Sequence, residues 1–165
     1  MSYMAYLTVD GEKQGGISKG CNSKPSMGGK YQLSHADEIS VIAYEHHLSR
    51  NGRKGGKSNS PLFITKFIDT STPLLAMSLS SGEILNCKLN FYRVNEGGFS
   101  ENFLTIELKN AIISSLSSNM PNVVAKSLDV PINEMYEVVG FSYQEIIWQH
   151  NLTGASGYDA WNKKD

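Results

Sequence analysis

Residues 61–93, PLFITKFIDTSTPLLAMSLSSGEILNCKLNFYR, predict a strand, a helix and a second strand in succession. Thr72 suits the helix N-cap, because its hydroxyl can accept a hydrogen bond from a free N–H group of the first turn. Pro73 suits the first helical position, where its missing N–H costs nothing, and Gly82 can adopt the left-handed conformation that ends a helix. Apolar and polar residues then alternate, which predicts a strand with one buried face. The residues expected on that face are Leu85, Cys87, Leu89 and Phe91.

The same period-two alternation predicts strands elsewhere in the chain. Residues 37–49, DEISVIAYEHHLS, and residues 135–150, MYEVVGFSYQEIIWQH, each predict one long strand, and residues 102–113 predict another. Residues 11–30, rich in glycine, serine and lysine, predict a loop with one short strand, and a further segment is expected near residues 123–130. In the strand at 135–150, the pattern places Val139, Phe141 and Tyr143 on one face, and Val138, Ile146 and Trp148 on the other.

Many strands with turns between them and one short helix predict a mainly β fold. We expect an antiparallel β-barrel or two-sheet sandwich with one short flanking α-helix. Two of the strands carry apolar residues on both faces, so each must be covered on both sides, by the helix, by the chain's end or by another subunit.

Composition excludes several classes of function. The chain has 165 residues, 40% hydrophobic and 19% charged, which is typical of one globular domain. Its net charge of −1 argues against a general nucleic-acid partner, and no apolar run is long enough to predict membrane insertion. The first residues lack the pattern of a cleaved signal peptide. Cys87 is expected in the core and Cys21 is expected to be an exposed thiol.

The basic stretch RNGRKGGKSNSP, residues 50–61, superficially resembles a phosphate-binding loop. A P-loop requires glycine five residues before Gly56, where this chain has Asn51. It must also lead into a helix that faces the anion, whereas a strand is predicted after Pro61. The stretch is therefore expected to be an exposed loop between two strands, and no cofactor is predicted.

Candidate catalytic groups are few. His46 and His47 are adjacent in a predicted strand and so point to opposite faces, which argues against a shared metal ion. His35 precedes the acidic residues Asp37 and Glu38, but no nucleophile motif accompanies them. We therefore predict no catalytic or metal-binding residues and no enzymatic activity. Two alternatives stay open, a small hydrolase that uses His35 with a nearby carboxylate or serine, and a stand-alone ligand-binding β-barrel.

Several segments, in order, resemble the haemolysin-coregulated protein (Hcp) family, whose members are tube subunits of bacterial type VI secretion systems. The resemblance is carried by MAYLTVDG at residues 4–11, HADEISVIAYEHHLS at 35–49, the strand–helix–strand run at 61–93, FLTIELKNAIISSL at 103–116 and VVGFSYQEIIWQH at 138–150. The strand ending in Asp, Thr, Ser, Thr and Pro before a leucine-rich helix is its most specific part.

The resemblance implies a structural protein that forms homohexameric rings. Such rings stack into an exported inner tube, which carries effectors in its lumen and chaperones them. The implied partners are other copies of the chain, the sheath and spike proteins of the type VI system, and small effectors. The implied location is the bacterial cytoplasm first and then the outside, without a cleaved signal peptide.

The resemblance also divides the chain. Residues 1–150 would form the family's barrel domain, with an extended basic loop at 51–60, and residues 151–165 would be a polar tail. In this family the loop reaches adjacent subunits or rings. We therefore expect subunit or ring-stacking contacts from four basic residues, Arg50, Arg53, Lys54 and Lys57.

Overall fold

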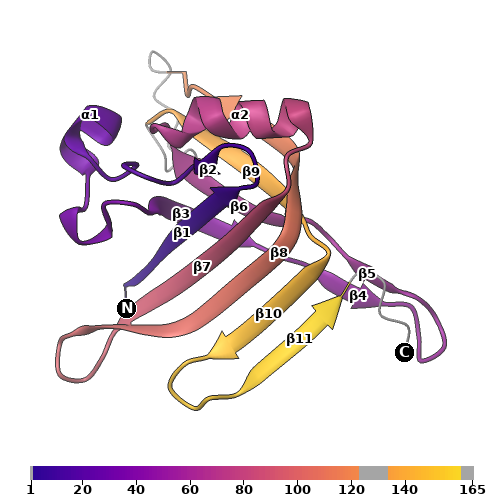
Figure 1. Ribbon diagram of the computed structural model, residues 1–165. Helices are drawn as coiled ribbons and strands as arrows, with labels where there is room; N and C mark the ends of the chain where they lie inside the picture. The colour runs from indigo at the N-terminus through magenta and orange to yellow at the C-terminus, as the bar shows by residue number, and fades with distance from the viewer. Residues whose placement is uncertain (1, 123–133, 161–165) are drawn as a thin grey trace.

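The computed structural model, which describes residues 2–122 and 134–160, is mainly β (Figure 1). Two short helices, α1 and α2, and two 3-10 turns interrupt the strands. The predicted segment near residues 123–130 lies outside the described residues. The elements are β1 (Tyr3–Gly11), β2 (Gly15–Gly16), α1 (Lys24–Met27), η1 (Gly28–Lys30), η2 (Leu33–His35), β3 (Ile39–Glu45), β4 (Leu48–Arg50), β5 (Lys57–Asn59), β6 (Leu62–Phe67), α2 (Ser71–Ser81), β7 (Leu85–Val94), β8 (Ser100–Asn119), β9 (Tyr136–Ser142), β10 (Glu145–His150) and β11 (Ser156–Ala160).

Nine strands form one antiparallel sheet in the order β11-β10-β8-β7-β1-β3-β6-β9, with β2 attached to β1. A further pairing between β8 and β9 closes the path from β8 through β7, β1, β3 and β6 to β9 into a barrel. The strands β10 and β11 extend the sheet beyond the closed part, and β4 and β5 form a separate two-stranded ribbon. The predicted antiparallel barrel with a short flanking helix is confirmed.

The long strand β8 belongs to both sides of the barrel. Its first half pairs with β10 from Leu104 to Lys109, and its second half pairs with β9 from Ile112 to Asn119. Asn110, between the halves, has a φ of 51°, the left-handed region that asparagine tolerates better than most residues. The strand therefore changes direction at Asn110 and leaves one sheet partner for another.

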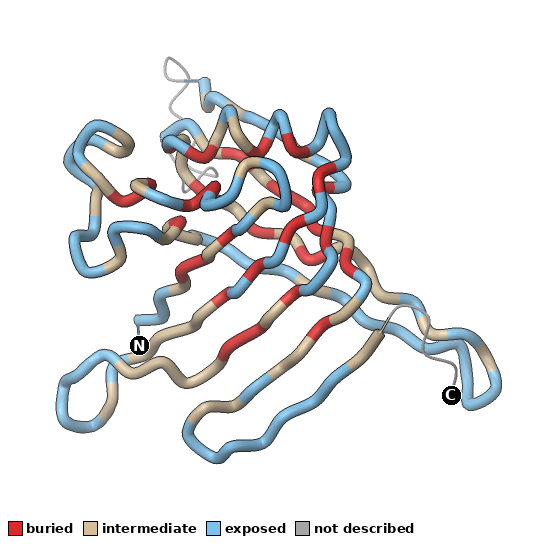
Figure 2. Tube along the Cα trace, viewed as in Figure 1, coloured by how far each residue is buried: buried red, intermediate tan, exposed pale blue. Residues whose placement is uncertain are grey.

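The core fills the barrel, and α2 covers one end of it (Figures 1 and 2). Of the residues predicted to face inward on β7, Leu85, Cys87 and Leu89 are buried and Phe91 is partly buried. The αL conformation of Gly82 ends α2 as expected. The helix begins at Ser71, two residues earlier than predicted. Asp69 Oδ1, not the Thr72 hydroxyl, accepts from the first free N–H, that of Ser71, at 2.8 Å. Thr72 lies inside the helix and its hydroxyl accepts from Asp69 N at 3.1 Å.

Neither long strand is continuous. The strand predicted at 135–150 ends at Ser142 and begins again at Glu145. Odd-numbered residues face the core before this break and even-numbered residues face it afterwards, so Ile146 joins the same core as Val139 and Phe141. The prediction that Ile146 faces the opposite side was wrong. The strand predicted at 37–49 likewise breaks at His46 and His47.

The prediction that Cys21 is an exposed thiol was wrong. Cys21 is fully buried, its thiol lies 3.9 Å from the Ile17 carbonyl oxygen, and burial raises its pKa to about 11. Within the segment expected to be a polar tail, Ser156–Ala160 pair with β10 as the edge strand β11. Residues 161–165 of that segment lie outside the described residues.

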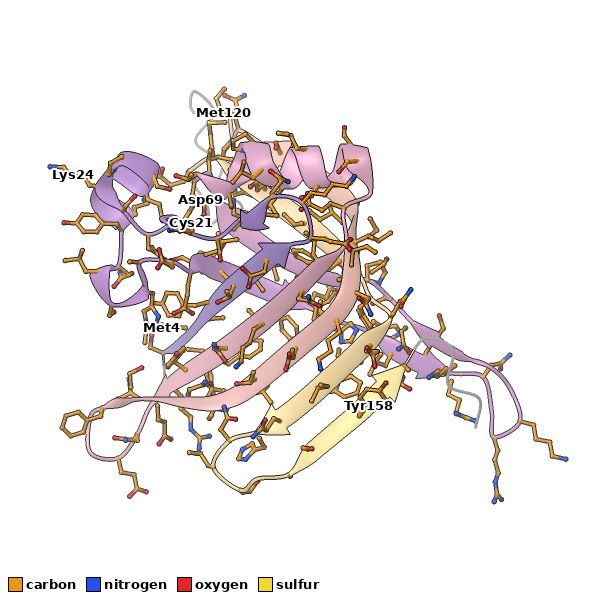
Figure 3. All side chains as sticks on the ribbon, viewed as in Figure 1. Met4, Cys21, Lys24, Asp69, Met120 and Tyr158 are labelled. Atoms are coloured by element: carbon orange, nitrogen blue, oxygen red, sulfur yellow. The ribbon has the colours of Figure 1, made fainter. Side chains whose placement is uncertain are left out.

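A buried lysine joins three elements at the covered end of the barrel. Lys66 of β6 is fully buried and contacts Glu137 of β9 and Asp69 Oδ1, the latter at 3.0 Å. Its Nζ also lies 3.3 Å from the Thr72 hydroxyl. Figure 3 labels Asp69 beneath α2, close to Cys21. The second carboxylate oxygens of Asp69 and Glu137 have no hydrogen-bond partner among the described residues, so the cluster depends on its single cation.

Replacing Lys66 with methionine should destabilise the fold strongly. The substitution leaves two buried carboxylates without a cation, a loss of about 3–5 kcal/mol in the free energy of unfolding. Chemical denaturation measures this loss. The matched control is Lys88→Met on the exposed face of β7, which should change stability by less than about 0.5 kcal/mol. Equal denaturation midpoints for the two variants would contradict a stabilising role of the cluster.

Candidate assembly surfaces

The basic stretch singled out in the sequence forms a projecting ribbon, residues 48–59, which we call the arm. Among the described residues its strands β4 and β5 pair only with each other, and in Figure 1 they extend beyond the barrel. Gly55 is required at the turn, because a Cβ there would lie 1.6 Å from the Asn51 carbonyl oxygen. The stretch expected as an exposed loop therefore forms a hairpin, with residues 51–56 as the turn between its two short strands.

Contacts of His46 and His47 hold the first strand of the arm at its root. His46 Nε2 lies 2.8 Å from the Tyr143 hydroxyl, between β9 and β10, and the His46 ring stacks toward Trp148. His47 N donates to the Ser60 hydroxyl at 3.0 Å. Burial raises the pKa of Tyr143 to about 12. Burial, with a smaller contribution from neighbouring His47, lowers the pKa of His46.

The second strand of the arm is held by Asp159 of β11. Lys57 Nζ donates to Asp159 Oδ1 at 2.5 Å and to the Ala160 carbonyl oxygen at 2.8 Å. Asn59 Nδ2 donates to the other carboxylate oxygen of Asp159 at 3.3 Å. Partial burial tends to raise the pKa of Asp159, but the hydrogen bonds from Lys57 and Asn59 outweigh it and lower that pKa.

The four basic candidates thus occupy two places. Arg53 and Lys54 lie at the exposed turn of the arm. Arg50 is also exposed but lies opposite Lys57 in the ladder of β4 and β5, and its guanidinium donates to the Arg53 carbonyl oxygen at 3.2 Å. Lys57 lies at the root, where its ammonium group contacts residues of its own chain. Whether any of the four contacts another subunit stays a prediction.

The outer faces of the barrel differ in chemistry. On β7 and β8, the outward residues Asn90 and Thr105 are joined by a hydrogen bond of 2.8 Å, and Asn151 donates to Thr105 at 3.0 Å. On the side of β3, β6 and β9, a shallow cavity of about 380 Å³ is lined by mostly apolar groups. Its lining residues are Ala43, Tyr44, Glu45, Phe63, Thr65 and Val138.

Gly140 allows the side chains on this second face to pack closely across β9. A Cβ at Gly140 would lie 2.6 Å from the Ser115 hydroxyl and 2.8 Å from the Phe63 ring. Half-exposed apolar side chains on a barrel already filled with a core are typical of a surface that contacts another molecule.

The residues proposed for hydrolysis form a packed aromatic cluster. The His35 ring stacks on Tyr6 with centroids 3.6 Å apart, contacts Tyr92 edge-on, and lies 3.1 Å from Glu38 through Nδ1. Within residues 2–122 and 134–160, no group of three histidines, cysteines or acidic residues could hold a metal ion. No helix in the same part of the chain is long and apolar enough to cross a membrane.

Comparison with known proteins decides the family. A family model described as the type VI secretion system effector Hcp matches residues 6–150. The chain is 33% identical over 171 residues to the major exported protein of Pseudomonas aeruginosa, covering 98% of this chain and 96% of that protein. This chain belongs to the Hcp family.

Solved Hcp structures share the fold across almost the whole chain. A crystal structure of an Hcp protein superposes with a TM-score of 0.89 at 29% identity, covering 99% of this chain and 100% of its own. The secreted protein Hcp3 from Pseudomonas aeruginosa gives a TM-score of 0.85 at 32% identity, covering 98% and 100%. The chain is accordingly a tube subunit of the type VI secretion system, and Hcp is a family of structural and secreted proteins. The hydrolase and stand-alone barrel alternatives are not favoured.

Sequence reasoning found the arm of this Hcp chain but missed what holds it. Lys57 and Asp159 are separated by 102 positions in the chain. Their opposite charges alone do not predict that they pair, because Asp159 lies in a segment that the sequence analysis interpreted as a polar tail. The only available signal was the alternation of Tyr158 and Ala160 with polar neighbours, which is too short to predict a strand.

The Hcp chain should lose stability as His46 becomes protonated. Because its pKa is lower in the folded than in the unfolded state, the stabilisation is complete above about pH 6.5 and is lost as the pH falls through the folded pKa. Denaturation of His46→Gln at a series of pH values should show a smaller loss of stability than wild type below pH ~6.5. The control His47→Gln, at the exposed neighbour, should retain most of the wild-type loss. Identical profiles for His46→Gln and wild type would refute this assignment.

Proposed function

We propose that this chain closes into homohexameric rings, that the rings stack into an exported tube, and that the outer part of the arm makes contacts between copies. The observation that carries the proposal is the arm itself, an ordered basic hairpin on a chain whose family assembles into tubes. The hairpin pairs with no strand of its own barrel. A heterologous contact repeated around a closed rotation produces a ring.

Charge supports the arm as the contact. Arg50, Arg53 and Lys54 gather three cations on a ribbon of a chain whose net charge is −1, so another copy has enough carboxylates to receive them. Exposed ion pairs contribute only about 0–1 kcal/mol each. A ring repeats the contact in every subunit, and the free energies of the linked contacts add up in the stability of the stack.

The wider functional setting follows the family. We propose that sheath and spike proteins of the type VI system contact the stacked rings and that small effectors travel in the lumen. We also propose that the chain is exported by this system from the cytoplasm without a cleaved signal peptide. The exported relative in Pseudomonas aeruginosa supports the export of this chain.

Reversing the charges at the turn of the arm tests it without placing a carboxylate opposite Lys57. The double variant Arg53→Glu, Lys54→Glu leaves Arg50, the ladder partner of Lys57, unchanged, whereas deletion of residues 52–57 would remove Lys57 itself. We expect wild type to sediment as rings and, on concentration, as stacks. The double variant should have the wild-type denaturation midpoint and at least tenfold fewer stacks, because every contact gains repulsion.

The conservative variant Arg53→Lys keeps the charge and should stack like wild type. Undiminished stacking of the double variant would exclude the charges at the turn. Monomeric wild type at every concentration, judged by sedimentation and negative-stain images, would exclude the ring.

A further inference from the structure

The contact between Lys57 and Asp159 differs from an ordinary surface ion pair. Both side chains are about four-fifths buried, with 22% and 20% of their surface exposed. Both carboxylate oxygens are used, Oδ1 by Lys57 and Oδ2 by Asn59, and the lysine also binds the Ala160 carbonyl oxygen. Charge-assisted hydrogen bonds with several partners are stronger and more directional than an isolated pair.

The position of this contact gives it a mechanical role. The arm shares no backbone ladder with the nine-stranded sheet, so strand pairing does not determine the angle at which it leaves the barrel. That angle depends on the chain leading into β4 and out of β5, and on side-chain contacts at the root. In Figure 1 the end of β11 lies beside β5, where Lys57 and Asn59 meet Asp159.

In the part of the chain that the structure describes, β11 has a strand partner on one side only. It pairs with β10 from Ser156 to Ala160 and forms the edge of the sheet, with Tyr158 exposed (Figure 3). The Tyr158 hydroxyl donates to Glu145 of β10 at 2.5 Å, which adds a side-chain contact to the ladder. The strand is therefore fixed to the barrel and can in turn fix the arm.

We propose that β11 is a strap that sets the direction of the arm, and that Lys57 and Asp159 are positioning residues for contact with a neighbouring copy. This inference rests on the proposed assembly function and changes the role expected of Lys57. That residue does not reach the next subunit; it orients the part of the arm that does.

Distance measurements between two spin labels test the strap directly. Both native cysteines are buried, so Ser49→Cys on the arm and Lys88→Cys on β7 can be labelled selectively at exposed positions. The doubly labelled chain is mixed with excess unlabelled wild type, so that distances within one subunit dominate. Pulsed electron resonance should give one narrow distance peak for wild type.

Four proteins separate positioning from simple stability. Lys57→Met and Asp159→Asn should lose the narrow peak while keeping the denaturation midpoint close to wild type. Lys57→Arg, which can still reach the carboxylate, should keep the peak. In sedimentation, ring association of the first two variants should weaken by roughly tenfold, because charge-assisted hydrogen bonds that fix the contact geometry are lost, and Lys57→Arg should associate like wild type.

Three results would overturn the proposal. They are a narrow peak retained in Lys57→Met and Asp159→Asn, a peak lost equally in Lys57→Arg, and normal association of variants whose arm has become mobile. Wild type that forms no rings overturns the proposed function instead, while its distance distribution still decides whether the strap orients the arm.

Discussion

The fold depends on one constraint, that a single strand must pair with different partners in its two halves. Strand β8 pairs with β10 before Asn110 and with β9 after it, and only this change of partner closes the barrel. Closure satisfies the backbone groups of β9 that would otherwise form an open edge. The other ladder of β9, with β6, places Glu137 opposite Lys66 beneath α2, so the strand that closes the barrel also supplies a carboxylate of the buried ion cluster. Backbone geometry and buried charge thus stabilise the same arrangement.

Much of this architecture could be predicted because its signals are local. The inward-facing residues of β7 and β8, such as Leu89 and Ile106, follow from period-two alternation. Gly82 ends α2 because glycine readily adopts the left-handed conformation, which the sequence alone indicates. What failed were features determined by distant partners. The breaks at Tyr143 and at His46 arise where strands change neighbours. At such a break, the alternate residues that face the core can change from odd-numbered to even-numbered. A hydropathy pattern contains no record of that change.

Burial of polar groups was the least predictable feature. Lys66 occupies an inward position of β6 that the alternation assigns to an apolar side chain, and it is tolerated because Glu137 and Asp69 arrive from elsewhere in the chain. Cys21 stands in a polar, glycine-rich context and is nevertheless covered. The candidate site shows the same division. The exposed cations of the arm were evident from composition, whereas the carboxylate that binds Lys57 was not, since pairing over such separations requires the folded chain.

The separation of arm from barrel has a physical consequence for assembly. A projection continuous with the main sheet would inherit its direction from the ladder, and any change in that direction would disturb the core. Here the arm is joined to the barrel by two connecting segments and by side chains such as His46 and Lys57. Substitutions at its root can therefore alter the geometry between copies at little cost to the barrel. A subunit that must repeat one contact accurately around a ring needs a narrow range of angles between arm and barrel. The strong, partly buried hydrogen bonds made by Lys57 at Asp159 restrict that range.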